Sequence, residues 1–234
     1  MQEALIDFSM GPLFRVCFAI LVVGLVYRAA VIKVQIWQAW SRAQNKNIPL
    51  GPSFQAMLRW AFPVRLFTAR PWFSLTSVLF HVGIIVAPLF VVGHVALLAP
   101  WLPSWWPILP AGLAEFLTLL AIVTTAALIV GRVASKRSRE LSDAADVLIL
   151  VVILLVFGFG YLAAHPETSP WNARTMLLLH VVFGNLALVL TPTTKIAHCV
   201  LFPFSQLVFD LAWHYPPETG RRVALALGKQ NERV

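Results

Sequence analysis

The sequence predicts an all-α integral membrane protein with five transmembrane helices. Of its 234 residues, 59% are hydrophobic and only 12% are charged, far from the balance of a soluble domain. A bilayer core of roughly 30 Å needs about 20 helical residues to cross it. Five apolar stretches reach that length, at about residues 13–38, 75–99, 111–133, 146–164 and 174–201.

Proline-rich breaks separate these stretches, for example at 99–103 and 165–170. The sequence contains no internal repeat and no segment that reads as a separate soluble domain. We therefore expect residues 1–205 to form one helical bundle and residues 206–234 to form a cytoplasmic C-terminal tail. The N-terminus carries Glu3 and Asp7 instead of a basic segment, so the first helix is expected to be an uncleaved anchor.

The distribution of basic residues predicts the orientation. Sixteen of the 18 Lys and Arg residues lie in the second half of the first span or the connection after it, at the connection between the third and fourth spans, or from Lys195 onward. Only Arg15 and Arg174 fall on the opposite side. This positive-inside bias places the N-terminus outside and the C-terminus in the cytoplasm. The net charge of +8 is therefore better explained by anionic lipid headgroups or a docked partner than by nucleic acid.

Four histidines lie inside the predicted spans, two near each end of the bilayer: His81, His94, His180 and His198. An ionisable side chain in hydrocarbon is costly unless it is paired or ligated, so each is a functional-site hypothesis. Four histidines at matched depths on two helices favour metal ligation, and bis-histidine haem is the leading candidate.

Helix geometry predicts which histidines pair. On a regular helix, the interval from His180 to His198 makes five turns and rises roughly 27 Å, which is nearly the thickness of the hydrocarbon core. Because the second and fifth spans run in opposite directions, His81 lies level with His198 on the cytoplasmic side. His94 likewise lies level with His180 on the outer side. We therefore expect an inner and an outer haem iron, each bound by one of these pairs.

The interval from His81 to His94 fits this scheme less simply, because it gives about 220° of rotation on an ideal helix. Pro88 lies between the two histidines and can kink or rewind the segment. Gly83 and Gly93 would let a flat macrocycle approach the backbone, although helix packing explains glycines equally well.

Other chemistries fit the residues poorly. The two cysteines, Cys17 and Cys199, cannot form a four-cysteine iron–sulfur site, and no C-x-x-C-H motif is present for covalent haem. Zinc or copper would need ligands clustered within a few ångströms. A haem-free small transporter or channel is the alternative, but such a protein usually shows repeats or broken helices around a midplane site.

The segments around the histidines resemble the cytochrome b (gamma) subunit of respiratory nitrate reductase. Residues 79–84, LFHVGI, and 92–94, VGH, look like the second helix of that family. Residues 180–184, HVVFG, and 191–198, TPTTKIAH, look like its last helix, with the same 18-residue interval. The resemblance covers roughly residues 15–205 and includes five helices with an outside N-terminus.

The resemblance implies a multi-pass subunit of the bacterial or archaeal cytoplasmic (inner) membrane. Such a subunit holds two b haems and passes electrons from menaquinone or another quinol to an iron–sulfur subunit on the cytoplasmic side. The same family serves complexes associated with sulfite reduction and heterodisulfide-reductase-like complexes, so the choice between a sulfur-linked and a nitrate-linked pathway is open. The outer loop 99–110 contains no lysine, so the quinol-site residues of nitrate reductase do not carry over.

Simpler roles are expected for the remaining polar residues. His165 is expected to be solvated in a short outer loop, with a quinone-site or proton-exit role as the alternative. Glu115 is expected to snorkel to the interface, although it could accept a quinol proton. Asp143 and Asp146 are expected to cap the fourth helix. Lys195 and Arg139 could meet haem propionates on the cytoplasmic side, and His214 is expected in an interfacial segment.

Overall fold

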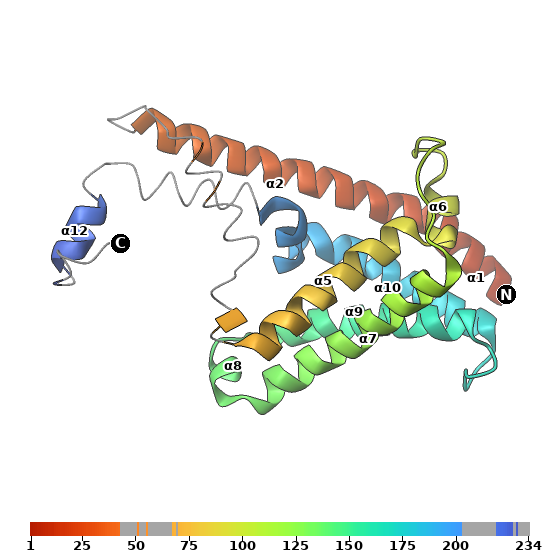
Figure 1. The fold of residues 1–234 in the computed structure, drawn as a ribbon. Coiled ribbons are helices and arrows are strands. Elements are labelled where there is room, and N and C mark those ends of the chain that lie inside the picture. Colours follow the sequence, from red (N-terminus) through yellow and green to blue (C-terminus); the bar gives the residue numbers. More distant parts are fainter. Residues whose placement is uncertain are drawn as a thin grey trace. The chain divides into compact units, whose positions relative to one another are not determined.

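The computed structural model describes residues 1–42, 51, 55, 67–68, 70–202, 219–226 and 228 (Figure 1). Within these residues the secondary structure is helical and no strand occurs. The chain forms two units. Unit 1 comprises Met1–Ala19 and Arg65–Leu190, and unit 2 comprises Ile20–Val64 and Thr191–Val234.

The described residues contain five helices that are long and apolar enough to cross a membrane, which agrees with the predicted number of spans. They are Gln2–Gln38, Pro71–Phe90, Ala111–Ala134, Ala144–Ala164 and Ala173–Thr193. The helical elements are α1 (Gln2–Phe8), a π-helical turn (Ser9–Leu13), α2 (Phe14–Arg42), α5 (Pro71–Phe90), α6 (Val92–Leu98), α7 (Ala111–Ala134), α8 (Lys136–Glu140), α9 (Ala144–Ala164), α10 (Ala173–Thr193), a 3-10 turn (Lys195–Ala197) and α12 (Thr219–Ala226).

The second predicted span is two helices. Helix α5 ends at Phe90, Val91 is extended with φ −68° and ψ 134°, and α6 begins at Val92. Pro88 lies in the last turn of α5, where a proline removes one backbone donor and crowds the preceding turn. The expectation that Pro88 breaks the regular helix between His81 and His94 is therefore confirmed.

The fifth predicted span is also interrupted, so the assumption of one regular helix over 174–201 is wrong. Helix α10 ends at Thr193, one residue after Pro192. Thr194 is extended, with φ −122° and ψ −168°, before the 3-10 turn Lys195–Ala197. Ideal helix rotation therefore does not relate His180 to His198.

Unit 1 is organised around α7, which packs against both α5 and α9 (Figure 1). The buried side chains between them form two apolar clusters: Ala87, Leu117, Ala121 and Phe157 in one, and Phe80, Leu128 and Leu150 in the other. Many large apolar side chains on these helices remain exposed, such as Val123 and Val130 on α7. Helices of a membrane bundle expose such side chains to lipid.

The N-terminal helix of unit 1 is joined to the start of α10 by polar contacts. Gln2 Nε2 donates to Thr175 Oγ1 at 2.9 Å, and Arg174 forms an ion pair with Glu3 at 2.8 Å. Further along, Asn185 Nδ2 donates to the carbonyl oxygen of Ser9 at 2.9 Å. These contacts place α1 beside α10.

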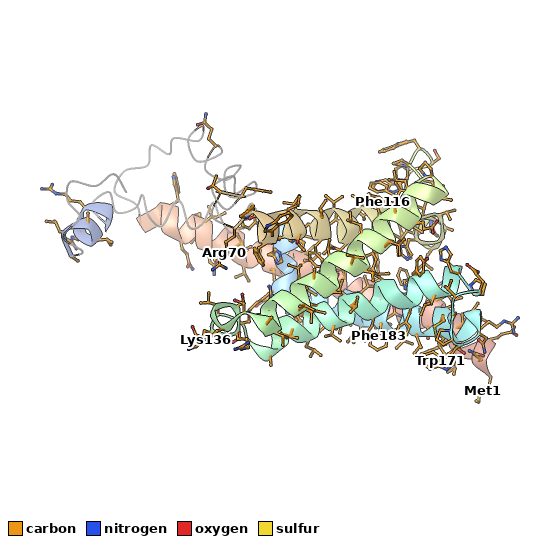
Figure 2. All side chains as sticks on the ribbon, turned by 60° about the horizontal axis from the view of Figure 1, so that its bottom comes forward. Met1, Arg70, Phe116, Lys136, Trp171 and Phe183 are labelled. Carbon is orange, nitrogen blue, oxygen red and sulfur yellow. The ribbon has the colours of Figure 1, made fainter. Side chains whose placement is uncertain are left out.

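The helices of unit 1 run between two ends. In Figure 2, Arg70 and Lys136 lie at one end, and Phe116 and Trp171 lie at the other. We call the second one the 99–110 end, after the loop that connects α6 to α7. At the first end, Asp143 is the N-cap residue of α9, and its N–H donates to Asp146 Oδ2 at 3.1 Å. The predicted capping role of these two aspartates is confirmed.

Gly83 allows α5 and α7 to approach closely. A Cβ atom at this position would lie 3.0 Å from Ala121 Cβ and 3.1 Å from its Cα and N atoms. Because those are mostly backbone atoms, they cannot turn aside. Gly83 therefore serves helix packing, which is one of the two roles considered for it from the sequence.

We predict that Gly83→Ala destabilises unit 1 by about 1–3 kcal/mol, the usual cost of overpacking a tight contact. The measurement is the temperature at which half of the detergent-solubilised protein aggregates. Gly131→Ala on α7 is the matched control, because a Cβ there meets nothing within 4 Å. Equal aggregation temperatures for the two variants would contradict the close α5–α7 contact.

Candidate functional site

Two of the four candidate histidines meet at the 99–110 end of unit 1. His94 on α6 and His180 on α10 approach with their Nε2 atoms 3.4 Å apart. Their rings are almost parallel, with an interplanar angle of 5° and centroids 5.7 Å apart. The structure thus brings together the two residues that depth matching assigns to the outer site. We call them the histidine pair.

In both rings Nδ1, the nitrogen that does not face the other histidine, contacts a main-chain carbonyl oxygen. His94 Nδ1 lies 3.1 Å from the Pro88 oxygen, and His180 Nδ1 lies 2.8 Å from the Val156 oxygen. A carbonyl oxygen only accepts hydrogen bonds, so the neutral rings carry their proton on Nδ1 and a lone pair on Nε2. Metal-ligating histidines are typically oriented in this way.

The contact between the two rings consequently joins two acceptors. Both residues are half-buried, and Nε2 lone pairs that face each other at 3.4 Å repel unless a cation lies between them. A metal ion is the group that two imidazole Nε2 atoms bind best. The donor set therefore fits a metal ion held by both histidines.

The break in the second span supplies the carbonyl that holds His94. A helix end leaves its last four carbonyls without intrahelical partners, and all four of α5 are accounted for. The carbonyls of Ala87, Pro88, Leu89 and Phe90 accept respectively from Val91 N, His94 Nδ1, Trp106 Nε1 and Leu109 N. The loop 99–110 and His94 together cap α5, which fixes the position of His94.

A glycine admits the His180 ring to α9. A Cβ atom on Gly160 would lie 2.8 Å from His180 Nδ1 and 3.0 Å from its Cε1. Any other residue at this position would push the ring away from the Val156 carbonyl. Gly160 was not singled out from the sequence, because only the approach of α10 to α9 reveals its role.

The spacing of the pair would allow both nitrogens to bind one metal ion. An imidazole nitrogen lies about 2.0–2.1 Å from a bound first-row metal such as zinc, so two nitrogens that share an ion are at most about 4 Å apart. The observed 3.4 Å lies within that limit. A Cβ at Gly93, next to His94, or at Gly184, four residues after His180, would meet nothing within 4 Å.

The other two candidate histidines show the same local pattern. His81 Nδ1 lies 2.6 Å from the Ser77 oxygen on α5, and His198 Nδ1 contacts the Lys195 oxygen. Both neutral rings therefore also carry their proton on Nδ1. His81 belongs to unit 1 and His198 to unit 2, so the pairing of these two residues stays a prediction.

Unit 2 has a groove beside His198. It has a volume of about 630 Å³, and its lining includes Tyr27, Arg28, Lys195 and Leu201. Arg28 Nη1 also donates to the Thr194 oxygen at 3.2 Å. The groove thus brings cationic side chains to the neighbourhood of His198. Arg139, by contrast, donates to the Val133 and Ala134 carbonyls and caps the end of α7.

The expectation that His165 is solvated in a loop is wrong. Its side chain is only 25% exposed and stacks on Tyr161, with ring centroids 4.2 Å apart. Its Nδ1 lies 3.0 Å from the Tyr161 oxygen, and its Nε2 lies 3.5 Å from Glu115 Oε1. The C-terminal turn of α9 holds the ring in place. His214 lies outside the described residues.

Comparison with known proteins finds one relative that covers nearly the whole chain. It is a curated protein of Nitratidesulfovibrio vulgaris (strain Hildenborough) whose name, "Protein", states no activity. The two sequences are 32% identical over 212 residues, which is 88% of this chain and 92% of the relative. No family model and no solved structure matches. The chain belongs to the same protein family as that Nitratidesulfovibrio vulgaris protein.

Proposed function

We propose that the chain is a membrane dihaem cytochrome b subunit of a respiratory quinone oxidoreductase complex. It carries electrons between the membrane quinone pool and an iron–sulfur subunit on the cytoplasmic side. The observation that carries this proposal is the histidine pair: two Nε2 lone pairs 3.4 Å apart on nearly parallel rings. Haem b bound there would supply one-electron transfer without a change of protein ligands.

The residues around the pair have defined roles in this proposal. The Pro88 and Val156 carbonyls fix the tautomer of each ring and make its Nε2 more basic. Gly160 gives His180 access to its carbonyl. The apolar cluster around Ala121 extends to Val91, which precedes His94 by three residues, and to Val156, whose carbonyl contacts His180. An apolar shell of this kind keeps water from the site and helps to set a redox potential.

The second haem is proposed at His81 and His198, on the cytoplasmic side. The positive-inside bias supports this orientation, with the N-terminus outside and the C-terminus in the cytoplasm. Arg28 and Lys195 line the groove beside His198 and suit the carboxylates of a haem propionate. A colourless, folded protein would favour the haem-free transporter instead.

The partner is proposed to dock on the cytoplasmic side, where the tail 206–234 lies in this orientation. Within the tail, the structure describes α12, whose Arg221 and Arg222 are exposed while Ala224 is buried. The chain has two cysteines, too few for a cluster of its own. Electrons must therefore pass to another protein. Whether that protein serves nitrate or sulfur metabolism is open.

We predict about two haems per wild-type chain and about one for either His94→Ala or His180→Ala, measured by pyridine haemochrome. The double variant should also hold about one, because both residues serve the same iron. His198→Ala should likewise hold one haem, whereas the variant in which His94, His180 and His198 are all replaced by Ala should hold none. A further loss in the His94/His180 double variant relative to the single variants would contradict a shared site.

We predict that Gly160→Ala weakens haem binding at the outer site by about 10–100-fold, the usual cost of losing the group that orients a metal ligand. The measurement is the rate at which haem transfers from the variant to excess apomyoglobin. Half of the haem, the part at the outer site, should transfer faster than in the wild type. Gly158→Ala lies on the same helix, and its Cβ would meet nothing within 4 Å. It should transfer haem at the wild-type rate. Identical rates for the two variants would mean that Gly160 does not position His180.

A further inference from the structure

A second pair of titratable side chains lies at the 99–110 end of unit 1. Glu115 comes from the first turns of α7, and His165 follows the last residue of α9. His165 Nε2 and Glu115 Oε1 are 3.5 Å apart, and their side chains are 25% and 48% exposed. The pair is therefore neither fully buried nor simply solvated, and it reaches the surface through Glu115.

The hydrogen bonds of His165 determine what this contact can do. Its Nδ1 proton is donated to the Tyr161 carbonyl, so in the neutral ring Nε2 carries a lone pair. A lone pair that faces a carboxylate oxygen is a repulsive contact of two acceptors. One added proton makes the contact attractive, whether it rests on the imidazole or on the carboxyl. Glu115 and His165 therefore form a site for one proton.

Helix α9 connects this site to the histidine pair. Val156 and Gly160 contact His180, and Tyr161, the next residue, stacks on His165. From Gly160 to His165 the helix rises only about 7.5 Å. A group that can take a proton thus lies roughly one and a half turns from the proposed outer electron acceptor. Tyr161 and Glu115 are the titratable side chains found in contact with His165 within the described residues.

We propose that Glu115 and His165 accept a proton from a hydroquinone that is oxidised at the 99–110 end of the membrane domain. This inference rests on the proposed function. Oxidation of a hydroquinone to a quinone breaks two O–H bonds and releases two protons and two electrons. A haem held by His94 and His180 would take up these electrons one at a time, passing the first onward before it accepts the second. One proton passes to the Glu115–His165 contact and then to bulk water through exposed Glu115, and the other passes to water directly.

The geometry also says why neither residue suffices alone. Glu115 without His165 would be an exposed carboxylate whose captured proton has no second partner. His165 without Glu115 would lose the acceptor that draws a proton onto Nε2. A positioned base of this kind raises the rate of a proton transfer by about 10²–10⁴-fold. The gain is largest at low pH, where little hydroxide is present to take the proton.

The test uses the full-length protein in detergent and measures haem reduction by duroquinol in a stopped-flow instrument. Glu115→Gln and His165→Gln should each slow reduction at pH 7 by at least about tenfold while haem content and the dithionite-reduced spectrum stay unchanged. The deficit should shrink as the pH rises, because hydroxide then takes the proton. A purely structural role would not produce that convergence.

Glu167→Gln is the matched control, since it removes the same charge from an exposed position in the loop that follows α9. It should reduce haem at the wild-type rate. Wild-type rates for Glu115→Gln with full haem content would overturn the proton-accepting role and leave the proposed function intact. Absence of haem from the wild-type chain would overturn the proposed function and this inference with it.

Discussion

The candidate site depends on two imidazole rings whose Nδ1 protons are donated to main-chain carbonyls. Once Pro88 and Val156 accept those protons, the facing Nε2 atoms have only lone pairs to present to each other. Their 3.4 Å separation is then stable only with a positive centre between them. In an apolar environment this requirement is stringent, because water does not screen the repulsion. The haem iron that we propose would meet it, and a single shared proton is the simpler competitor.

Local breaks in the helices create the geometry. Because α5 ends at Phe90, the carbonyl of Pro88 is available to the ring of His94. Trp106 Nε1 and Leu109 N donate to the neighbouring carbonyls of Leu89 and Phe90. At His180 the same result is reached without a break, because Gly160 lacks a side chain. A helix break orients the ring of His94, and a glycine on the neighbouring helix orients the ring of His180. The close α5–α7 contact at Gly83 holds the first of these helices in place.

The sequence predicts the number of long apolar helices and the closeness of His94 to His180, for reasons that can be stated. Hydrophobic length alone finds five spans, and opposite helix directions bring His94 level with His180. The 3-10 turn after Thr194 was not predicted, because Pro192 sits in the last turn of α10 and its effect falls two residues later. The contact between Glu115 and His165 also could not be predicted, since it depends on how α7 and α9 pack. Gly160 looks like any membrane-helix glycine until its neighbour is known.

The most direct test of the central claim is the electron paramagnetic resonance spectrum of the oxidised, full-length protein. Two imidazoles bound to one ferric haem give a low-spin signal, and the nearly parallel planes of His94 and His180, 5° apart, predict a rhombic one. That signal should disappear in both His94→Ala and His180→Ala. The haem proposed at His81 and His198 keeps its own low-spin signal in both variants. An unchanged set of low-spin signals in either variant, or a wild-type spectrum with no low-spin haem, would therefore contradict the assignment of these two residues to one iron.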